Sequence, residues 1–446
     1  MDLRALVVSQ LADSILLCGF ADADADADGD SAKAITIAMS RTLGLSEATV
    51  RPVARALAKD PLFQLPAKER KSLLVEWLHI NPLFMELWHR HSPRIRRWPL
   101  QPYPPEQKPG AGQPSRWGVP PLANANELAA WLNLSPADLI WFSQKYKQRT
   151  GCKPLRHYHH HFMAKSNGDL RLLETPKQRT KLIQQKIHQQ ILRSIPVHGA
   201  CHGFVGGRSI KSYVQPHVAK AVVIAMDLKL FFLSVSVARV FHVFRYLGYN
   251  SEVSGYLKGL CVTKTPPDIL TTLDLQQQSN YLSEHLPQGA PTSPMLANLV
   301  AFRLDQRLSA LAKQMNYEYS RYADDLAFSA YEFNPNQIRR LINSVTQIVS
   351  NEGFHINTGK TRIMTASQQQ RLTGIVINEK INIAKPTLKR FEALLYNCVR
   401  FGPKSQNTSQ HPNFAAHLEG RLAFYRDLVP HKVEKFYRLY DQIQWD

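Results

Sequence analysis

Two adjacent aspartates, Asp324 and Asp325, lie within a strand-like segment that constrains the fold more than any other part of the chain. In residues 317–329, apolar and polar side chains alternate on both sides of Tyr322-Ala323-Asp324-Asp325. Alternation with a period of two indicates half-buried strands, and the Ala-Asp-Asp-Leu stretch indicates a tight turn between them. The pattern predicts a β-hairpin that displays both carboxylates at its tip.

A third aspartate, Asp227, ends a short apolar run over residues 222–226 that is typical of a buried strand. Neighbouring carboxylates repel each other, so folding alone gives no reason to place Asp324 beside Asp325. A divalent cation gives such a reason, because Mg²⁺ prefers oxygen ligands. If Asp227 and Asp324 converge from neighbouring strands, they can hold two ions about 3.5–4 Å apart. The alternative is two surface acids on an ordinary hairpin.

Between the two acidic segments, residues 286–298 form a loop rich in proline that leads into a helical pattern. The N-terminus of such a helix offers main-chain amides to an anion. Gln288 has donor and acceptor groups able to hold a nucleotide. Gly289 allows close approach of another backbone. The loop is therefore a candidate for binding an anionic ligand.

The charge of the chain indicates a polyanionic partner. Lysine and arginine number 55 against 35 acidic residues, a formal charge of +20. Such a surplus favours nucleic acid through counterion release, although a merely basic protein is the alternative. The five cysteines form no CxxC pair, which argues against a disulfide framework and a zinc ribbon. With no apolar run near the roughly 18 residues of a membrane span and no signal pattern, we expect a cytoplasmic protein without a membrane partner.

The first part of the chain divides by composition. Residues 1–95 have helical periodicity and predict an N-terminal helical extension, in which the Ala-Asp alternation of residues 21–28 indicates a solvated acidic loop. Residues 96–122 are rich in proline and predict a semi-rigid linker. A helical pattern follows, for which Asn126 or Ser135 is the expected cap.

Residues 165–171 predict a hairpin turn between two strands, with Lys165 and Arg171 on its two sides. The next segment, to about residue 195, predicts an amphipathic helix whose basic face fits either solvent or phosphates. A run of histidines precedes the turn, at His157, His159, His160 and His161. Because a strand directs alternate side chains to opposite faces, we do not expect these histidines to form a metal site.

Taken together, three motifs in this order resemble the palm motifs of reverse transcriptases: Asp-x4-Phe after a strand at 227–232, Pro-Gln-Gly-x-Pro-x-Ser-Pro at 287–294, and Tyr-Ala-Asp-Asp at 322–325. The resemblance covers roughly residues 123–446. It implies an α+β, right-hand polymerase fold. Residues 123–380 would be the fingers and palm, with the Tyr-Ala-Asp-Asp hairpin in the antiparallel palm sheet. Residues 381–446 would be a short, helical, basic thumb.

The resemblance also implies a role for each motif. The catalytic carboxylates, which would hold two Mg²⁺ ions with Mn²⁺ as a possible substitute, would be Asp227, Asp324 and Asp325. Deoxynucleotides (dNTPs) would be bound by Lys165, Arg171, Phe232, Gln288, Gly289 and Lys360. Of these, Phe232 would be the steric gate against a ribose 2′-hydroxyl and Lys360 the general acid. The primer grip would be Leu372, Thr373 and Gly374.

Within this family the chain is most similar to retron reverse transcriptases, through residues 198–210 and the Leu-Thr-Gly of residues 372–374. The retron element Asn-Ala-x-x-His keeps only its histidine, His217, and Leu230 replaces an acidic residue that is common after the first catalytic aspartate. RNA contacts would come from His217, Arg390, Arg421, Arg426 and Lys432.

A retron enzyme implies particular partners. These are a cognate structured non-coding RNA and the multicopy single-stranded DNA copied from it, primed by an RNA 2′-hydroxyl. An effector protein and a role in anti-phage defence would complete the system. The alternatives are a stand-alone defence or minimal group II-like reverse transcriptase, and a catalytically inactive RNA-binding module. The role of residues 1–95 and the oligomeric state are left open by the sequence.

Overall fold

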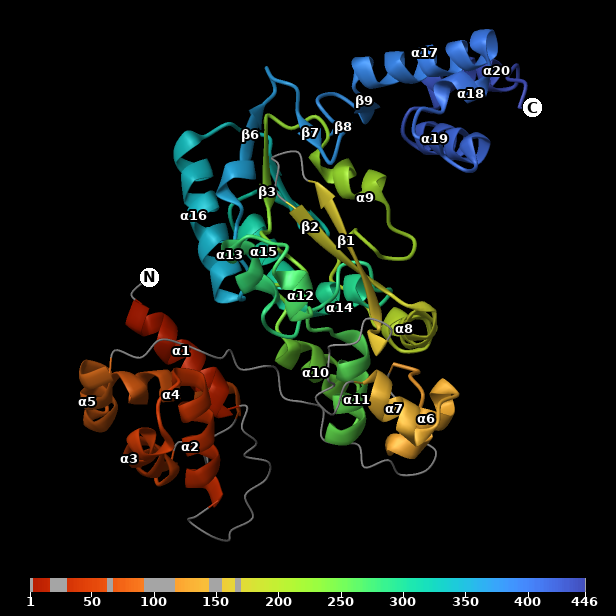
Figure 1. The fold of residues 1–446 in the computed structure, drawn as a ribbon. Helices are drawn as coiled ribbons and strands as arrows, with labels where there is room; N and C mark the ends of the chain where they lie inside the picture. The colour runs from red at the N-terminus through yellow and green to blue at the C-terminus, as the bar shows by residue number, and fades with distance from the viewer. Residues whose placement is uncertain are drawn as a thin grey trace. The chain divides into compact units, whose positions relative to one another are not determined.

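The computed structural model describes residues 3–16, 30–61, 67–91, 117–143, 155–164 and 170–445. The chain forms two compact units, Met1–Gly110 and Ala111–Asp446, which are shown in Figure 1. No helix in the described ranges is both long enough and apolar enough to cross a membrane.

The first unit is helical and has a hydrophobic core of its own. Its described residues form α1 (Leu3–Leu16), α2 (Asp30–Leu43), α3 (Glu47–Ala58), α4 (Ala67–Ile80) and α5 (Pro82–His91). Val8, Leu11, Ile35 and Phe84 are fully buried between these helices. The predicted boundary at residue 95, the acidic loop of residues 21–28 and most of the predicted linker lie outside the described residues.

The centre of the second unit is a four-stranded antiparallel sheet with the order β4-β5-β3-β6. Its strands are β3 (Val222–Asp227), β4 (Glu318–Tyr322), β5 (Asp325–Ala330) and β6 (Arg362–Thr365). Antiparallel sheets combined with many helices make this an α+β protein, as expected.

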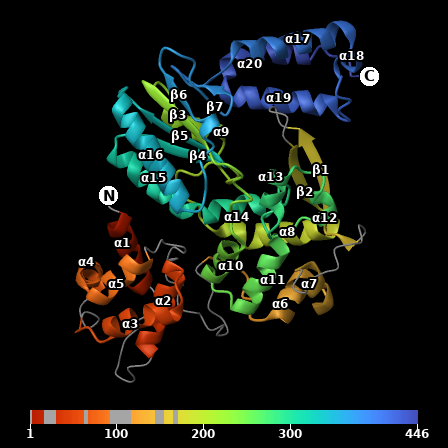
Figure 2. The same cartoon turned by 60° about the vertical axis from the view of Figure 1, so that its left-hand side comes forward.

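Helices cover both faces of this sheet. Since successive residues of a strand point to opposite faces, alternate residues of β3 pack into two different cores. Val222, Ile224 and Met226 pack with α14 (Ser293–Val300), α15 (Phe302–Gln314) and α16 (Pro335–Asn351). Val223 packs on the opposite face, with α9 (Ile210–Val214) and the C-terminal helices. Figure 2 shows α15 and α16 along one side of the sheet.

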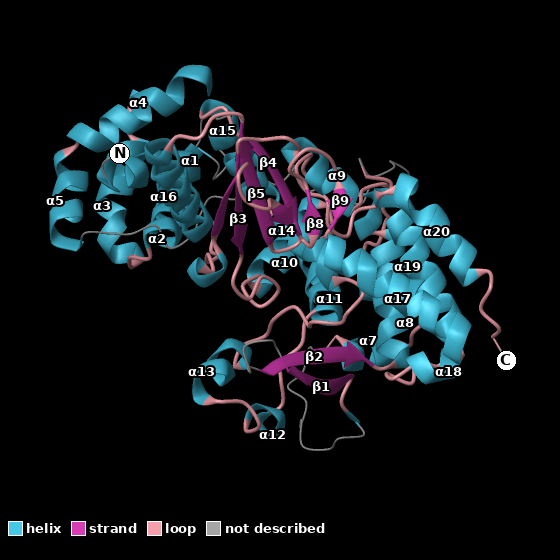
Figure 3. Cartoon of the chain, turned by 90° about the horizontal axis from the view of Figure 1, so that it is seen from above, coloured by secondary structure: helices cyan, strands magenta, loops and turns pink. Residues whose placement is uncertain are grey.

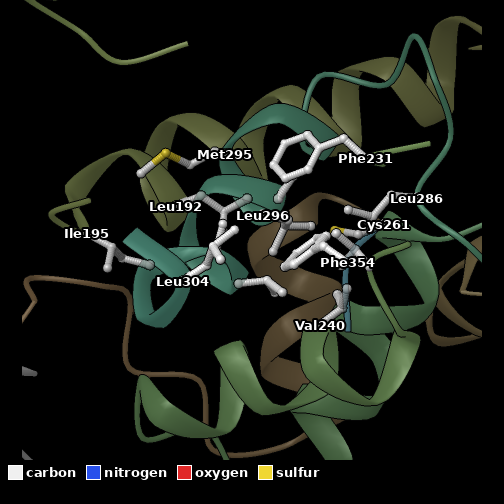
Figure 4. Packing of buried hydrophobic residues seen from close by; sticks show 14 of the residues in the cluster. Leu192, Ile195, Phe231, Val240, Cys261, Leu286, Met295, Leu296, Leu304 and Phe354 are labelled. Carbon is white, nitrogen blue, oxygen red and sulfur yellow. The ribbon is translucent and has the colours of Figure 1, made fainter. Parts of the chain in front are cut away.

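The larger core joins segments that are far apart in sequence. In Figure 4, Leu192, Phe231, Leu296 and Phe354 lie close together. Further helices close this core: α6 (Ala125–Leu132), α7 (Pro136–Phe142), α8 (Gln178–Gln190), α10 (Val237–Tyr246) and α11 (Ser251–Cys261).

The predicted helix caps were half right. Ser135 caps α7 by accepting a hydrogen bond from Asp138 N, but the cap of α6 is Asn124 and not Asn126. Asn124 accepts a hydrogen bond from Glu127 N, and the Glu127 carboxylate reaches back to Ala123 N at 2.7 Å. This reciprocal pairing satisfies helix-end amides and determines where α6 begins.

Two smaller sheets complete the unit. Strands β1 (Tyr158–Ala164) and β2 (Leu170–Pro176) form an antiparallel pair, which confirms the strands predicted around residues 165–171. Figure 3 shows this pair apart from the four-stranded sheet, near α12 (Pro267–Leu270) and α13 (Leu275–Gln278). The second small sheet contains β7 (Arg371–Leu372), β8 (Ile375–Val376) and β9 (Asn382–Ile383). The chain ends in α17 (Lys385–Phe401), α18 (Pro403–Gln406), α19 (Phe414–Leu428) and α20 (Pro430–Tyr440).

Candidate active site

The four-stranded sheet places Asp227 at the end of an inner strand. Asp227 is 8% exposed and lies opposite Asp325 in the register of β3 and β5. Residues directly opposite each other in neighbouring strands direct their side chains to the same face. The carbonyl of Asp227 accepts a 2.8 Å hydrogen bond from Asn357 N, so the strand end is held on its other side as well.

The hairpin of β4 and β5 has a loop of two residues, Ala323 and Asp324, because Tyr322 pairs with Asp325 across it. Ala323 has a φ of 56°, and tight hairpin turns need a left-handed residue at this position. The carbonyl of Asp324 accepts a 2.9 Å hydrogen bond from Leu228 N. Since Leu228 directly follows Asp227, all three aspartates meet at one corner of the sheet.

The environment of this corner opposes negative charge. Burial, followed by the charges of Asp324 and Asp227, raises the pKa of Asp325 to about 6. Burial also raises the pKa of Asp324, and the charge of Asp227 adds to the effect, whereas Lys360 and Arg171 oppose it. Carboxylates that repel each other in a partly buried site are stabilised by a cation.

Lys360 supplies one positive charge here. Its Nζ lies 2.8 Å from Asp227 Oδ1, and its side chain is 59% exposed. No group of three or more His, Cys, Asp or Glu side chains is arranged to hold a metal ion within the described residues. Asp227, one of the three predicted carboxylates, is instead paired with the Lys360 ammonium in this structure. The donors themselves, three carboxylates, fit Mg²⁺.

A buried hydrogen-bond network supports the turn. Arg321 is fully buried and makes a bidentate ion pair with Asp305, with Nε–Oδ1 and Nη2–Oδ2 distances of 2.7 Å. Its Nη1 donates to the carbonyl of Ala323 at 2.9 Å and to Asn298 Oδ1 at 3.0 Å. Asn298 Nδ2 donates to the carbonyl of Gly203 at 2.8 Å. The network therefore fixes the turn that carries the aspartates.

This network was not predicted from the sequence. Arg321 was visible as a charged residue at a strand position next to Tyr322, but its partners come from α14 and α15. A buried charge requires a paired and hydrogen-bonded partner, so Arg321 was a signal for a buried acid. Nothing in the local sequence shows that the acid is Asp305.

The Gln288-Gly289 loop lies against β2. The carbonyl of Gln288 accepts a 2.8 Å hydrogen bond from Glu174 N. Gly289 has a φ of 126°, and a Cβ there would lie 3.2 Å from the carbonyl oxygen of Glu174. Both the backbone conformation and the close approach favour glycine. Ser293, at the start of α14, donates its hydroxyl to the carbonyl of Pro287 at 2.8 Å and fixes the loop on the helix.

Glu174 is a second buried group that the sequence reasoning missed. One carboxylate oxygen accepts a 2.9 Å hydrogen bond from Thr265 Oγ1, and the other lies 2.7 Å from His285 Nε2. Burial alone would lower the pKa of His285, but its hydrogen bond to Glu174 and the charge of that carboxylate raise it. This cluster anchors β2 beside the Gln288-Gly289 loop.

Phe232 follows Asp227 after a tight turn. Leu230 lies inside that turn with a φ of 52°. The ring of Phe232 is partly buried and lies 5.6 Å from that of Phe231 and 6.4 Å from that of Phe204. Phe204, Phe231 and Phe232 therefore form a group of neighbouring aromatic rings. Two of them lie a few residues after Asp227 in the chain, and Phe204 follows a glycine that lies beside the turn carrying the other two aspartates.

Comparison with known proteins identifies the family. Residues 163–377 match the family model described as "Reverse transcriptase (RNA-dependent DNA polymerase)". The chain is 34% identical over 338 residues to the retron Mx65 reverse transcriptase of Myxococcus xanthus, and the match covers 74% of each chain. The chain belongs to the retron reverse transcriptases. It is therefore an RNA-directed DNA polymerase.

Other retron reverse transcriptases agree. The retron Mx162 enzyme of Myxococcus xanthus is 33% identical over 333 residues, which are 72% of this chain and 67% of that one. The retron Ec86 enzyme of Escherichia coli is 31% identical over 256 residues, which are 57% of this chain and 71% of that one.

The other residues predicted to bind the nucleotide or the primer in this reverse transcriptase lie on β2 and on the β7–β8 hairpin, except for Lys165. Lys165 lies outside the described residues. Arg171 is exposed on β2, close enough to Asp324 to influence its pKa. Leu372 is buried, and Thr373 and Gly374 form the turn between β7 and β8 with φ values of 43° and 92°.

The residues predicted to contact RNA fall into two groups. Arg390 and Arg426 are exposed on α17 and α19. Arg421 lies over the ring of Phe391 at 4.4 Å, and Lys432 Nζ donates to Asn382 Oδ1 at 3.0 Å. In contrast, His217 is fully buried, and both of its ring nitrogens are hydrogen-bonded to serines. His217 offers no surface to RNA in this structure, so we do not propose an RNA contact for it.

Proposed function

We propose that this retron reverse transcriptase copies part of a cognate structured RNA into multicopy single-stranded DNA by two-metal nucleotidyl transfer. The convergence of Asp227, Asp324 and Asp325 at one corner of the sheet supports this proposal most directly. These carboxylates would hold two Mg²⁺ ions, and Mn²⁺ would be a suitable substitute. When bound, the ions would activate the primer hydroxyl and stabilise the leaving pyrophosphate.

The residues around the aspartates would position the incoming deoxynucleotide. Arg171, together with Lys165, would bind the triphosphate. The Gln288-Gly289 loop would hold the nucleotide against β2. Phe232 would exclude a 2′-hydroxyl by steric contact. Fixed cations and dipoles stabilise the charge that develops during phosphoryl transfer.

Lys360 would act as the general acid for the leaving pyrophosphate. Its ammonium pairs with Asp227 in this structure, but more than half of the Lys360 side chain is exposed, which would allow it to turn towards a bound triphosphate. The small hairpin Leu372-Thr373-Gly374 would grip the primer strand.

The overall proposal is a right-hand polymerase. The four-stranded sheet would be the palm, β1 and β2 part of the fingers, and α17–α20 a basic thumb that binds the non-coding RNA through Arg390, Arg421, Arg426 and Lys432. An RNA 2′-hydroxyl would be the primer, and an effector protein would act with the enzyme in anti-phage defence. Similarity to the retron enzymes supports the RNA partner and its DNA copy.

Primer extension by the purified full-length protein tests the chemistry. The double variant Asp324→Asn plus Asp325→Asn should lose at least about a thousandfold in rate, because the oxygen donors for both ions are weakened. The matched control is Glu379→Gln plus Asp441→Asn, which neutralises two exposed acids and should keep the parent rate. Activity that survives in the first variant would rule out the proposed site. RNA covalently linked to DNA in the purified material tests the retron-specific priming.

A further inference from the structure

We propose that Phe204 is a second aromatic residue that contacts the nascent base pair and contributes to nucleotide selection beside Phe232. This inference rests on the proposed role of Phe232 as a steric gate. It assigns a specificity-determining role to a residue of the Gly-Phe-Val-Gly-Gly-Arg-Ser segment.

The first observation is the exposure of this ring. Phe204 is 51% exposed although the ring lies only 6.4 Å from that of Phe232, at an angle of 54°. Phe232 itself packs on the main core. Phe204 is thus the more exposed member of the aromatic pair, and its ring is adjacent to the residue proposed to contact the nucleotide sugar.

The second observation is backbone strain. Phe204 has a φ of 61°, a left-handed conformation that bulky residues rarely adopt. An exposed phenylalanine gains little from burial that could compensate for this conformation. Strained residues of this kind cluster at ligand sites, where surrounding structure holds them in place.

The third observation shows what holds the segment. Arg321 N donates to the carbonyl of Ala200 at 2.7 Å, and His202 N donates to the carbonyl of Arg321 at 2.8 Å, so the chain before Phe204 is paired with β4. A Cβ on Gly203 would lie 2.6 Å from Ala323 N. The backbone that leads into Phe204 is therefore held against the same turn that carries the aspartates.

These constraints determine the kind of ligand. A rigid, exposed aromatic ring next to a polymerase site fits the flat faces of bases and the apolar edges of sugars. Because Phe232 would contact the sugar of the incoming nucleotide, the adjacent Phe204 ring would contact the base pair that this nucleotide forms. Loss of Phe204 should then weaken dNTP binding and reduce discrimination between deoxy- and ribonucleotides.

Phe204→Gly separates this role from a structural one. Glycine adopts a φ of 61° without strain, so we expect the variant to have a Tm equal to or above that of the parent. We also expect the KM for dTTP on a poly(rA)/oligo(dT) substrate to rise about tenfold, with a smaller change in kcat, because a ligand contact is lost. The preference for dTTP over UTP should fall by a similar factor. Phe204→Ala should have the same kinetic defects, whereas Phe204→Tyr should keep parent kinetics.

Two comparisons complete the experiment. Phe333→Ala removes a phenylalanine that is 52% exposed in the loop after β5 and should leave KM and sugar preference unchanged. Phe232→Val tests the gate separately. If Phe232→Val loses sugar discrimination but Phe204→Gly and Phe204→Ala match the parent in KM and preference, the inference about Phe204 is wrong and the proposed gate stands. If Phe204→Gly loses stability together with activity, the ring is structural and the inference is also wrong.

Discussion

Backbone strain is concentrated at individual residues of the candidate site. Of the eight non-glycine residues with positive φ in the described ranges, four lie on its segments: Phe204, Leu230, Ala323 and Thr373. A left-handed conformation costs roughly 1–2 kcal/mol per residue. Such strain persists only where tertiary contacts hold it, and it commonly marks sites of function. The aspartate turn, the gate segment and the predicted primer grip share this property.

The hydrogen-bond partners of His217 determine which of its ring nitrogens carries the proton. Ser320 Oγ donates its only proton to the carbonyl of Tyr213 at 2.9 Å, so it must accept from His217 Nε2–H at 2.7 Å. His217 Nδ1 then accepts from Ser329 Oγ–H at 2.7 Å. The imidazole is neutral and joins β4, β5 and α9. Burial, followed by the charges of Lys220 and His202, lowers its pKa to about 3.

The lowered pKa of His217 predicts a loss of stability in acid. The unfolded state takes up this proton near pH 6.5, before the folded state does. The free energy of unfolding should therefore fall as the pH falls from 6.5 towards about 3, by at most about 1.4 kcal/mol per pH unit from this residue. Urea unfolding of the parent and of His217→Gln across this range measures the contribution. The stability difference between the two proteins should shrink with falling pH; a difference independent of pH would contradict the assignment.

At the level of elements, the segment before Phe204 is held beside β4 by an isolated β-bridge and two backbone hydrogen bonds. Cys201 bridges to Arg321, and Gly203 packs against the turn between β4 and β5. The ion pair of Arg321 and Asp305 lies beneath this junction. Removal of one partner from a buried ion pair leaves an uncompensated charge and typically costs about 3–5 kcal/mol. The junction therefore contributes to stability as well as to the position of the aspartates.

Gly203→Ala tests the close approach at this junction. The added Cβ would lie 2.6 Å from Ala323 N, so the segment or the turn must move. A displacement of about 1 Å at catalytic groups can reduce the rate about a hundredfold, and we expect a loss in kcat of at least about tenfold. Single-turnover primer extension measures this effect.

Gly206→Ala is the matched control for this experiment. It adds the same methyl group three residues later, where no atom lies within 4 Å of the new Cβ. Its kcat should equal that of the parent. Equal effects of both substitutions would show that the close approach of Gly203 to the turn is unimportant.

At the scale of the whole molecule, the two units have separate cores. Among the described residues, the buried cluster of the first unit extends from Val7 to Leu87, and the clusters of the second begin at Val119. All residues of the candidate site belong to the second unit. Domains with their own cores can in principle fold alone.

The separate cores predict that residues 111–446 extend a primer without the first unit. We expect the rate on a poly(rA)/oligo(dT) substrate to stay within about threefold of the full chain, because the described residues of the candidate site and of its core lie within this unit. Residues 1–110 alone should unfold cooperatively in a thermal melt followed by circular dichroism. An inactive but folded second unit would show that the helical extension takes part in catalysis.

Local patterns carried much of the prediction. The alternation around Tyr322 predicts the β4–β5 pair, and the apolar run before Asp227 predicts β3. Both signals are local, because the burial of strand side chains follows the order of consecutive residues. Turn chemistry similarly predicts the pairing of β1 with β2. The predicted Asn126 cap was wrong. Asn124 caps the helix instead, because Glu127 N donates to its side chain while the Glu127 carboxylate accepts from Ala123 N.

The family and the α+β class could be predicted from the sequence alone, as could the candidates for the chemical roles, because motif order and side-chain type are local properties of the chain. The folded chain alone reveals that Arg321 is paired with Asp305, that Glu174 anchors the Gln288-Gly289 loop and that His217 is buried. These facts depend on groups brought together from distant segments, where the cost of burying a polar group selects its partner. The sequence motifs supply Asp227, Asp324 and Asp325, and the pairing of distant strands brings them to one corner of the sheet.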